Sequence, residues 1–285
     1  MLVLGAKGMV GSAVYKYFRQ QSEVFTLGTD RTDADFSFLE VSSVEKDIKN
    51  IIQQNRKIDY LINAIGLLDK NTEKSSISKK DYQKVNTFFL SNLAELSNIY
   101  GYKLIHISTD AVFPPNSGSV TELDKPQPMG DYAKSKFLGE PSTQNVLTFR
   151  TSIIEANCQQ TSGLLNWVYY SKEKCLTGYT NQLWAGCTAL QFAQLCFDII
   201  INNQFDKLRK SSPIYHFAPV GPLTKYQLLK TFIKISKSSK EVKKGEGKKQ
   251  TRYLTSTYNV FSKYSCDINT AIKEMLQYEG LISSN

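Results

Sequence analysis

Two groups of residues in this sequence have the types and spacing needed for proton and hydride transfer. Tyr132 and Lys136 stand four residues apart, downstream of a glycine-rich loop that contains Gly5, Gly8 and Gly11. Residues i and i+4 share one face of a helix, so the Lys136 ammonium can lower the free energy of the Tyr132 phenolate. A tyrosine placed in this way can pass a proton to a carbonyl oxygen. Tyr-x-x-x-Lys alone also fits a solvated helix, but the order of the two motifs predicts nicotinamide redox chemistry.

The glycine loop follows the apolar segment Met1–Leu4 and precedes a helical pattern at Ser12–Phe18. Three glycines let the backbone turn tightly and approach a pyrophosphate, while the helix offers its N-terminal amides. Their spacing, Gly-x-x-Gly-x-x-Gly, differs from the common Gly-x-Gly-x-x-Gly. The loop residues expected to bind a dinucleotide are Gly5, Lys7, Gly8, Met9, Val10 and Gly11.

Asp30 and Arg31 are adjacent in the region where a side chain should select the coenzyme ribose. A carboxylate there favours the free 2′-hydroxyl of NADH, whereas Arg31 and Lys7 would attract the 2′-phosphate of NADPH. The sequence favours NADPH, with NADH as the alternative.

Strand and helix patterns alternate along the first half of the chain. The segment Asp59–Ala64 is continuously apolar up to its last residues, which is typical of a strand covered on both faces of a parallel sheet. The alternation predicts an α/β fold with a doubly wound parallel sheet, the Rossmann fold, and a smaller C-terminal substrate-binding lobe. The expected strands are Met1–Leu4, Val24–Leu27, a short element near Asp35–Phe36, Asp59–Ala64, Leu104–Ser108, Val146–Phe149 and Tyr215–Ala218, and the expected helices are Ser12–Phe18, Val44–Gln54, Asp81–Tyr100, Tyr132–Gly139, Leu164–Tyr170, Leu190–Ile201 and one capped by Thr224.

These patterns also divide the chain into domains. We expect residues 1–152 to form the NAD(P)-binding domain, with a helix at about 188–203 and a strand at about 214–218 returning to it. Residues of about 153–187 and 219–285 should form the substrate-binding lobe.

The composition argues against several classes of protein. The chain has 285 residues, 41% of them hydrophobic, which is enough for a sizeable core. Its longest apolar run, Leu61–Leu68, is shorter than the roughly 18 to 20 residues that span a bilayer. Five cysteines without a Cys-x-x-Cys pair predict neither a disulfide framework nor a zinc site, and with two histidines we expect no metal. Because the N-terminus enters a strand and the glycine loop at once, we expect no leader and a cytoplasmic protein.

The net charge of +9 comes largely from a lysine-rich segment between Lys225 and Arg252. The favoured interpretation is a solvated loop, and the weaker alternatives are attraction of an anionic nucleotide and nucleic-acid binding. Aromatic residues do not alternate with these lysines as a base-stacking surface would require. We therefore expect no nucleic-acid partner.

The chain resembles the extended short-chain dehydrogenases/reductases, and among them the dTDP-4-dehydrorhamnose reductase group of sugar-nucleotide reductases. The motifs that carry the resemblance keep their order over most of the chain. They are Gly5-x-x-Gly8-x-x-Gly11, Asp35-Phe36, Asn63-Ala64, Asn86, Ser108-Thr109-Asp110-Ala111-Val112-Phe113, Tyr132-x-x-x-Lys136 with Gly139-Glu140, Phe149-Arg150-Thr151 and Gly178-Tyr179-Thr180-Asn181.

The resemblance implies a role for each catalytic residue. Tyr132 is the proton donor, Thr109 hydrogen-bonds the same carbonyl oxygen, and Lys136 supports Tyr132 and holds the nicotinamide ribose. Asp35 and Phe36 would meet the adenine, and Asn63 and Ala64 the sugar and phosphates of the cofactor. The residues expected near the substrate are Asn86, Asp110, Ala111, Asn181, Gln182 and Trp184.

Structural interpretations stay open for several of these residues. Thr109 could form a turn at a strand end, Asn86 could lie on a helix surface, and Trp184 could belong to the core. Arg150 is expected to serve structure, through a loop backbone, rather than a ligand.

The resemblance implies an NAD(P)H-dependent reductase of a nucleotide-linked 4-keto-6-deoxy sugar, acting in surface polysaccharide precursor synthesis. Ala111 stands where that group commonly has Tyr, which leaves the sugar and the base open. Two alternatives remain: an epimerase or epimerase/reductase, whose extra acid or base could be Cys158, Cys187 or His216, and a noncatalytic NADP-binding regulatory subunit. Homodimers are common in the family, so a homodimer is one expectation.

Overall fold

The computed structural model describes residues 1–30, 37–55, 57–68, 77–155 and 163–283. The chain divides into two compact units, each assembled from three segments. Unit 1 contains Met1–Val112, Pro126–Arg150 and Ala193–Tyr215, and unit 2 contains Phe113–Lys125, Thr151–Phe192 and His216–Asn285. The segment Phe113–Lys125 thus belongs to unit 2, although the sequence patterns group it with the cofactor-binding domain.

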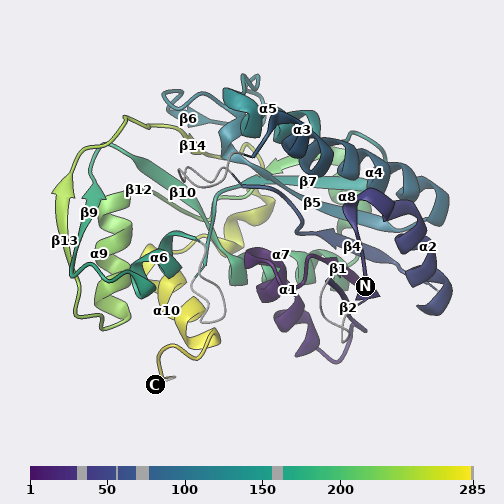
Figure 1. Ribbon diagram of the computed structural model, residues 1–285, viewed down its shortest axis with the longest axis horizontal. Coiled ribbons are helices and arrows are strands. Elements are labelled where there is room, and N and C mark those ends of the chain that lie inside the picture. The colour runs from purple at the N-terminus through teal and green to yellow at the C-terminus, as the bar shows by residue number, and fades with distance from the viewer. Residues whose placement is uncertain (31–36, 56, 69–76, 156–162, 284–285) are drawn as a thin grey trace. The chain divides into compact units, whose positions relative to one another are not determined.

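Unit 1 is built on a seven-stranded sheet with the order β11-β7-β5-β4-β1-β2-β3 (Figure 1). The strands are β1 (Leu2–Leu4), β2 (Leu27–Asp30), β3 (Ser37–Phe38), β4 (Tyr60–Asn63), β5 (Lys103–Thr109), β7 (Val146–Thr151) and β11 (Ile214–His216). The pairs β1/β2, β1/β4, β2/β3 and β4/β5 are parallel. The doubly wound α/β prediction is confirmed. The strand order reverses between β1 and β4, and ligands of open α/β sheets bind at the carboxyl ends of strands at such a point.

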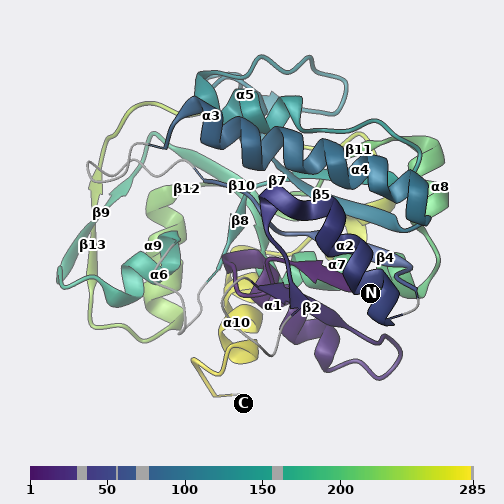
Figure 2. The ribbon, with the colours of Figure 1, turned by 45° about the vertical axis from the view of Figure 1, so that its right-hand side comes forward.

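Helices cover both faces of this sheet (Figures 1 and 2). On one face, Phe18 of α1 and Phe197 of α7 are in edge contact, with ring centroids 5.6 Å apart. On the other face α2 packs against α4. The helices with residues in this unit are α1 (Met9–Arg19), α2 (Val44–Asn55), α3 (Lys79–Tyr82), α4 (Phe89–Tyr100), α5 (Gly130–Leu138), α7 (Ala189–Ile201) and α8 (Phe205–Ser211), with the short η1 (Val41–Ser43) and η3 (Asp110–Val112).

The second strand lies three residues further along the chain than the apolar pattern Val24–Leu27 predicts. β2 begins at Leu27, where Leu27 pairs with Leu2 and Gly28 with Val3. Phe25 is 71% exposed, so the apolar run is not all buried. The strand instead contains the small residues Gly28 and Thr29, both buried, because register with β1 decides where pairing starts.

The long helix predicted at Asp81–Tyr100 contains a π-helical segment. α3 leads into η2, Gln83–Phe88, which has π geometry, and α4 follows. The end of α4 is as predicted, since Gly101 closes it in the left-handed region with φ of 75°. A π segment inserts one extra residue into a turn and often occurs at functional sites.

Unit 2 contains small sheets and helices around its own core. Its largest sheet has the order β12-β10-β8, and two strand pairs, β13/β9 and β14/β6, are parallel. Thr224 caps α9 in a capping box with Gln227, as the sequence predicts. The elements are β6 (Ser119–Val120), β8 (Ile153–Ile154), α6 (Leu164–Tyr170), β9 (Cys175–Tyr179), β10 (Leu183–Thr188), β12 (Val220–Thr224), α9 (Lys225–Ile235), β13 (Glu241–Gly245), β14 (Tyr253–Leu254), η4 (Asn259–Tyr264) and α10 (Ile268–Tyr278).

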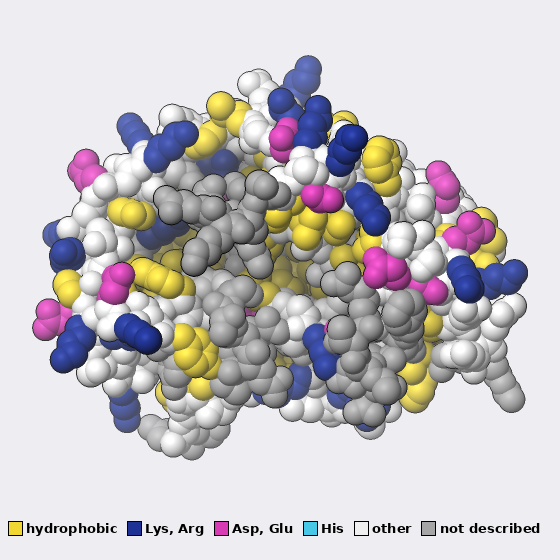
Figure 3. All heavy atoms as spheres, in the orientation of Figure 1, with side chains coloured by type: hydrophobic (Ala, Val, Ile, Leu, Met, Phe, Trp, Pro, Cys, Tyr) yellow, Lys and Arg dark blue, Asp and Glu magenta, His cyan; other side chains and the backbone are white. Residues whose placement is uncertain are grey.

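The lysine-rich segment of unit 2 is partly ordered secondary structure rather than one solvated loop. It includes α9 and β13, and the ammonium of Lys244 lies 5.8 Å from the ring centroid of Tyr226. Figure 3 shows Lys and Arg side chains scattered over the face in view and interspersed with Asp and Glu.

Candidate active site

The glycine loop makes a tight turn between β1 and α1. Gly5 has φ of +71°, in the left-handed region, and the Gly8 amide donates to the Gly5 carbonyl at 2.8 Å. A Cβ on Gly11 would lie 2.0 Å from the Gly5 oxygen, so only glycine fits there. Gly8 is the N-cap of α1, and in the described chain no side chain caps this helix and its first turn holds no acidic residue. The α1 N-terminus therefore suits an anionic group.

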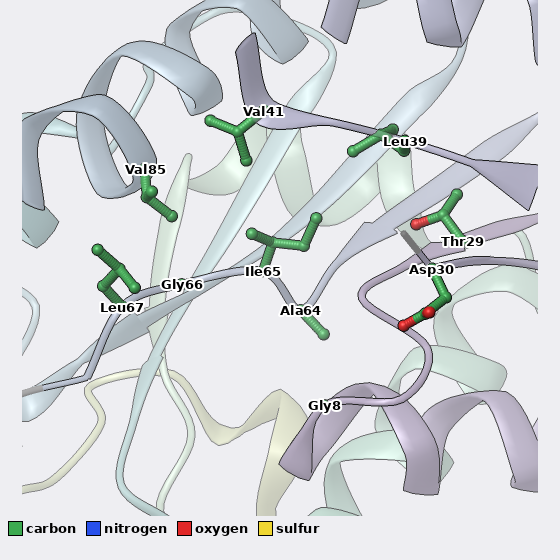
Figure 4. Close-up of a pocket in the computed structure, with 10 residues that line it drawn as sticks. All are labelled: Gly8, Thr29, Asp30, Leu39, Val41, Ala64, Ile65, Gly66, Leu67 and Val85. Atoms are coloured by element: carbon green, nitrogen blue, oxygen red, sulfur yellow. The ribbon is translucent and has the colours of Figure 1, made fainter. Parts of the chain in front are cut away.

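A cavity of about 280 Å³ opens beside this loop, at the reversal of strand order (Figure 4). Thr29 and Asp30, at the end of β2, lie on one side near Gly8, while Leu67 and Val85 lie at the other end. The remaining lining residues are mostly apolar: Leu39, Val41, Ala64, Ile65 and Gly66. A polar end near a helix N-terminus with apolar walls fits a nucleoside phosphate.

Hydrogen bonds fix the polar end of the cavity to the glycine loop. The Gly5 amide donates to Thr29 Oγ1 at 3.2 Å, and the Ala6 amide to the Thr29 carbonyl at 3.1 Å. These bonds place Asp30, the next residue, beside the loop. Lys7, Met9 and Val10 lie on the loop or the first turn of α1 but do not line the cavity. Arg31, Asp35 and Phe36 lie outside the described residues.

Asn63 and Ala64, which follow β4, have different environments. Ala64 lines the cavity, but the Asn63 side chain is 1% exposed and accepts from the Ile65 amide at 3.0 Å. Its amide nitrogen lies 3.4 Å from His106 Nδ1. Asn63 thus shapes the turn that carries Ala64 and Ile65, and its contact with a cofactor stays a prediction.

Tyr132 and Lys136 share one face of α5, as the sequence predicts. Lys136 is 7% exposed, and its Nζ donates to the Ile107 carbonyl at 2.7 Å. Burial lowers the pKa of Lys136 to about 8, and the negative charge of Glu140 opposes this decrease. A Cβ on Gly66 would lie 3.8 Å from the same Nζ, so Lys136 reaches the loop that lines the cavity. Tyr132, in the first turn, is partly exposed and its ring is 6.0 Å from that of Tyr82.

Thr109, the last residue of β5, forms a turn with the residues that follow it. Its hydroxyl accepts from the Ala111 amide at 3.1 Å and donates to the Asp110 carboxylate at 3.3 Å. The turn-forming interpretation of Thr109 is therefore observed. Contact of Thr109, Asp110 or Ala111 with a substrate stays a prediction.

Asn86 lies in the π segment and holds the cavity loop rather than occupying a helix surface. It is 2% exposed, its Oδ1 accepts from the Leu67 amide at 2.9 Å, and its Nδ2 donates to the Leu67 carbonyl at 3.0 Å. Nδ2 also donates to Ser135 Oγ on α5 at 3.1 Å. The side-chain amide bonds both the N–H and the C=O of Leu67, as the backbone of a neighbouring strand would. Asn86 therefore positions the loop that carries Leu67. Contact with a substrate stays a prediction.

The substrate residues predicted after position 150 lie in unit 2, where each has a structural partner. Asn181 pairs with both backbone groups of Gly247, at 2.8 and 3.0 Å, and Gln182 donates to the Lys248 carbonyl. Trp184 is 7% exposed within the unit 2 core, and its indole donates to Ser152 Oγ at 3.0 Å. Trp184 therefore follows the core interpretation that the sequence leaves open.

The described part of the chain holds neither a metal-binding cluster nor a membrane-spanning helix. Its His, Cys, Asp and Glu side chains form no group of three or more that could hold a metal ion. Within the same ranges, every helix is too short or too polar to cross a membrane.

Several residues that line the cavity lie outside the sequence motifs. Leu39, Val41 and Val85 come from two segments whose apolar positions suggest only core packing. Glu140 also gains a role: its carboxylate binds the Arg150 guanidinium, so Arg150 is structural as expected but pairs with a side chain. Long-range pairing of this kind cannot be read from local spacing.

Known proteins resemble this chain in sequence. The Xenopus laevis methionine adenosyltransferase 2 subunit beta is 25% identical over 80% of this chain and 69% of its own, and its mouse counterpart matches over 41% of its length. The Shigella flexneri dTDP-4-dehydrorhamnose reductase is 27% identical over 55% of this chain and 52% of its own.

Solved structures agree with the fold. A Clostridium acetobutylicum dTDP-4-dehydrorhamnose reductase superposes with a TM-score of 0.76 at 17% identity, covering 97% of this chain and 98% of the other. Residues 1–258 match the family described as RmlD substrate binding domain. The predicted resemblance is confirmed: the chain belongs to this RmlD-like family of extended short-chain dehydrogenases/reductases.

Proposed function

We infer that this protein is an NAD(P)H-dependent oxidoreductase that reduces a nucleotide-linked 4-keto-6-deoxy sugar. One observation carries the proposal. Lys136 Nζ is within reach of Gly66, a residue of the nucleotide-sized cavity, while Tyr132 lies on the same face of α5. The Lys136 ammonium thus links the predicted proton donor, Tyr132, to the cavity predicted to hold the cofactor.

The chemistry follows from these residues. A nicotinamide coenzyme held by the glycine loop and Lys136 would supply the hydride for reduction of the sugar carbonyl, and the carbonyl oxygen would then carry negative charge. Tyr132 donates its phenolic proton to that oxygen, and the Lys136 ammonium stabilises the phenolate that remains. Thr109 hydrogen-bonds the same oxygen once its hydroxyl turns from Asp110.

The coenzyme preference depends on Asp30, Lys7 and Arg31. The sequence favours NADPH because two cations stand near the ribose position. Asp30, which lines the cavity, supports NADH, since its carboxylate would bind a 2′-hydroxyl and repel a 2′-phosphate. NADPH therefore stays the sequence prediction, and Asp30 is the residue that tests it.

The identity of the sugar rests on the reductase relatives. Their similarity supports a nucleotide-sugar substrate and a role in surface polysaccharide precursor synthesis. A cytoplasmic homodimer is proposed on the same basis.

The test is oxidation of NADPH and NADH with enzymatically generated dTDP-, UDP- and GDP-4-keto-6-deoxy sugars. We expect oxidation with at least one sugar by the wild type, and almost none by Tyr132→Phe. Coenzyme binding without oxidation on any sugar would contradict the proposal.

A second candidate is a noncatalytic nucleotide-binding subunit, favoured by similarity to methionine adenosyltransferase 2 subunit beta over 80% of this chain. Copurification of a partner enzyme, with coenzyme bound but not oxidised, would favour it. The Thr109, Tyr132 and Lys136 set argues for catalysis instead.

The epimerase alternative lacks a suitable second acid or base among its described candidates. Cys187 is buried, donates to or accepts from Thr151, and burial raises its pKa to about 12. His216 is 1% exposed, with Nδ1 facing the carbonyls of Val120 and Thr255. Cys158 lies outside the described residues.

A further inference from the structure

A buried ion pair lies at the end of α5, one helical turn beyond Lys136. Arg150 of β7 donates to the Glu140 carboxylate twice, from Nε at 2.9 Å and from Nη2 at 2.7 Å. Ser108 Oγ of β5 donates to the same carboxylate at 2.5 Å. The side chains of Arg150 and Glu140 are only 5% and 3% exposed. Replacing such a pair with apolar residues is often neutral or stabilising, so stability alone does not explain it.

The ion pair is connected to Lys136 by the helix and by the strand. Glu140 follows Lys136 by four residues, and the turn continues because the Glu140 amide donates to the Phe137 carbonyl at 3.1 Å. On the strand side, Ser108 comes directly after Ile107, whose carbonyl accepts from Lys136. One carboxylate therefore fixes both the helix that carries Lys136 and the strand that receives its hydrogen bond.

Glu140 is also a negative group close to a buried ammonium. The elements packed against α5 are β5, η2, α3 and η3. Their titratable side chains are His106 on β5, Asp110 on η3 and Tyr82 on α3, with Lys79, Lys80, Asp81, Lys84 and Lys103 more exposed. His106 is 2% exposed, and burial and Lys136 hold its pKa well below the usual range, so it is neutral. Glu140, on the turn that follows α5, is the group whose charge raises the pKa of Lys136.

We propose that Glu140, held by Arg150 and Ser108, is a positioning residue that keeps Lys136 positively charged and directed at the Ile107 carbonyl. The proposal rests on the proposed function for its catalytic consequence, because Lys136 acts there through Tyr132. The effect of Glu140 on the charge of Lys136 does not depend on that function, because it involves the protein alone. The Glu140 carboxylate binds residues of β5 and β7 just beyond the end of α5, and its charge favours the protonated form of Lys136.

Two substitutions separate a charge effect from a structural one because both disrupt the pair formed by Glu140 and Arg150 while removing charges of opposite sign. Glu140→Gln leaves the Arg150 cation, which disfavours protonated Lys136. Arg150→Met leaves the Glu140 anion, which favours it. A purely structural role would shift both variants in the same direction. The double variant Glu140→Gln/Arg150→Met leaves neither charge buried alone and is the form to use if a single variant does not fold.

The experiment is an NMR titration of the full-length protein without coenzyme or substrate, with lysine labelled with carbon-13 at Cε. The Lys136 signal is assigned by its loss in Lys136→Met. We expect its midpoint to fall by about one pH unit in Glu140→Gln, a tenfold change in the protonation equilibrium. We expect the midpoint to rise in Arg150→Met. In the double variant we expect it to fall by less than in Glu140→Gln, because Glu140 is the charge that raises the pKa of Lys136.

Shifts of both single variants in one direction, or an unchanged or higher midpoint in the double variant, would overturn the proposal. Ser108→Ala is the uncharged control, for which we expect a much smaller shift. The titration needs no turnover. If the midpoints are as expected but the protein oxidises no coenzyme, the reductase function is contradicted and the role of Glu140 is supported.

Discussion

The ammonium of Lys136 donates a hydrogen bond to the carbonyl of Ile107 at 2.7 Å, in a position that is 7% exposed. One carbonyl and the charge of Glu140 do not replace the hydration shell that an exposed lysine has. The pKa of Lys136 therefore falls to about 8. Burial of this ammonium therefore opposes folding while the lysine is protonated.

Lys136→Met should therefore stabilise the fold while removing activity. At pH 7 both the folded and unfolded chains carry the charge, so its burial opposes folding by roughly 1 to 3 kcal/mol, which the substitution removes. In the wild type, the free energy of unfolding should rise between pH 8 and 10.5, where only the unfolded chain keeps the proton. Urea unfolding at several pH values measures both effects. Lys134→Met, on the exposed side of α5, is the control. Equal changes in the free energy of unfolding of the two variants would show that burial of the Lys136 charge does not oppose folding.

Tyr132→Phe should lower turnover by about 10²- to 10⁴-fold, the usual contribution of a general acid. Coenzyme affinity should change little, because the ring remains against Tyr82. Steady-state rates and coenzyme fluorescence titration measure the two quantities. Tyr17→Phe, where the ring packs on Phe197, serves as the control. Near-normal turnover of Tyr132→Phe would remove this residue as the acid.

Asp30→Asn should shift coenzyme choice towards NADPH, whichever coenzyme the wild type prefers. The carboxylate lines the cavity near Gly8, so its removal ends repulsion of a 2′-phosphate and weakens a bond to a 2′-hydroxyl. We expect the ratio of the two dissociation constants to change by about tenfold, equivalent to about 1.4 kcal/mol. Calorimetry with NADH and NADPH gives the ratio, and Glu23→Gln controls for net charge. An unchanged ratio would mean that Asp30 does not face the ribose.

Asn86→Ala should destabilise the loop that lines the cavity. The substitution leaves the amide and carbonyl of Leu67 without the side-chain amide that pairs with both, a loss of about 1 to 3 kcal/mol. The temperature of thermal unfolding and the affinity for coenzyme should both fall. Asn92→Ala, exposed on α4, is the matched control. If coenzyme affinity is retained in Asn86→Ala, the loop does not depend on this pairing.

His106 should make the fold sensitive to acid. Burial lowers its pKa well below 6.5, so as the pH falls below about 6.5 the unfolded chain binds a proton that the folded chain does not. Stability should then be lost by up to about 1.4 kcal/mol per pH unit. Denaturant unfolding between pH 7.5 and 5 measures the slope. His106→Asn should have a shallower slope, and an identical slope would exclude His106 as the cause.

The sequence predicts those parts of the site that depend on local spacing. Gly5 and Gly11 are required by contacts within one turn, and Tyr132 and Lys136 share a face through helix periodicity alone. By contrast, the start of β2 depends on register with β1, and the π segment at Gln83–Phe88 lies within a stretch whose apolar pattern predicts one regular helix. Both differences are invisible in a local pattern.

Contacts between distant segments account for the rest. The cavity wall joins Leu39 and Val41 to Val85, and the ion pair joins Glu140 to Arg150; only the strand order brings these residues together. The family resemblance implies that Asn86 and Asn181 lie near a substrate. In the structure the Asn86 amide pairs with the backbone of Leu67 and bonds Ser135, and the Asn181 amide pairs with the backbone of Gly247. Polarity and position predict that a side chain forms hydrogen bonds, but not with which partner.

The two units are assembled from six alternating segments, so the chain crosses from one unit to the other five times. A gene fragment that starts at the first residue and ends before Tyr215 therefore encodes neither unit completely. Truncated expression or exchange of a contiguous half with a homologue would leave strands or helices without their neighbours. A fragment that is to contain all of unit 1 must reach Tyr215, and one that is to contain all of unit 2 must begin no later than Phe113, so each complete unit carries more than one segment of the other.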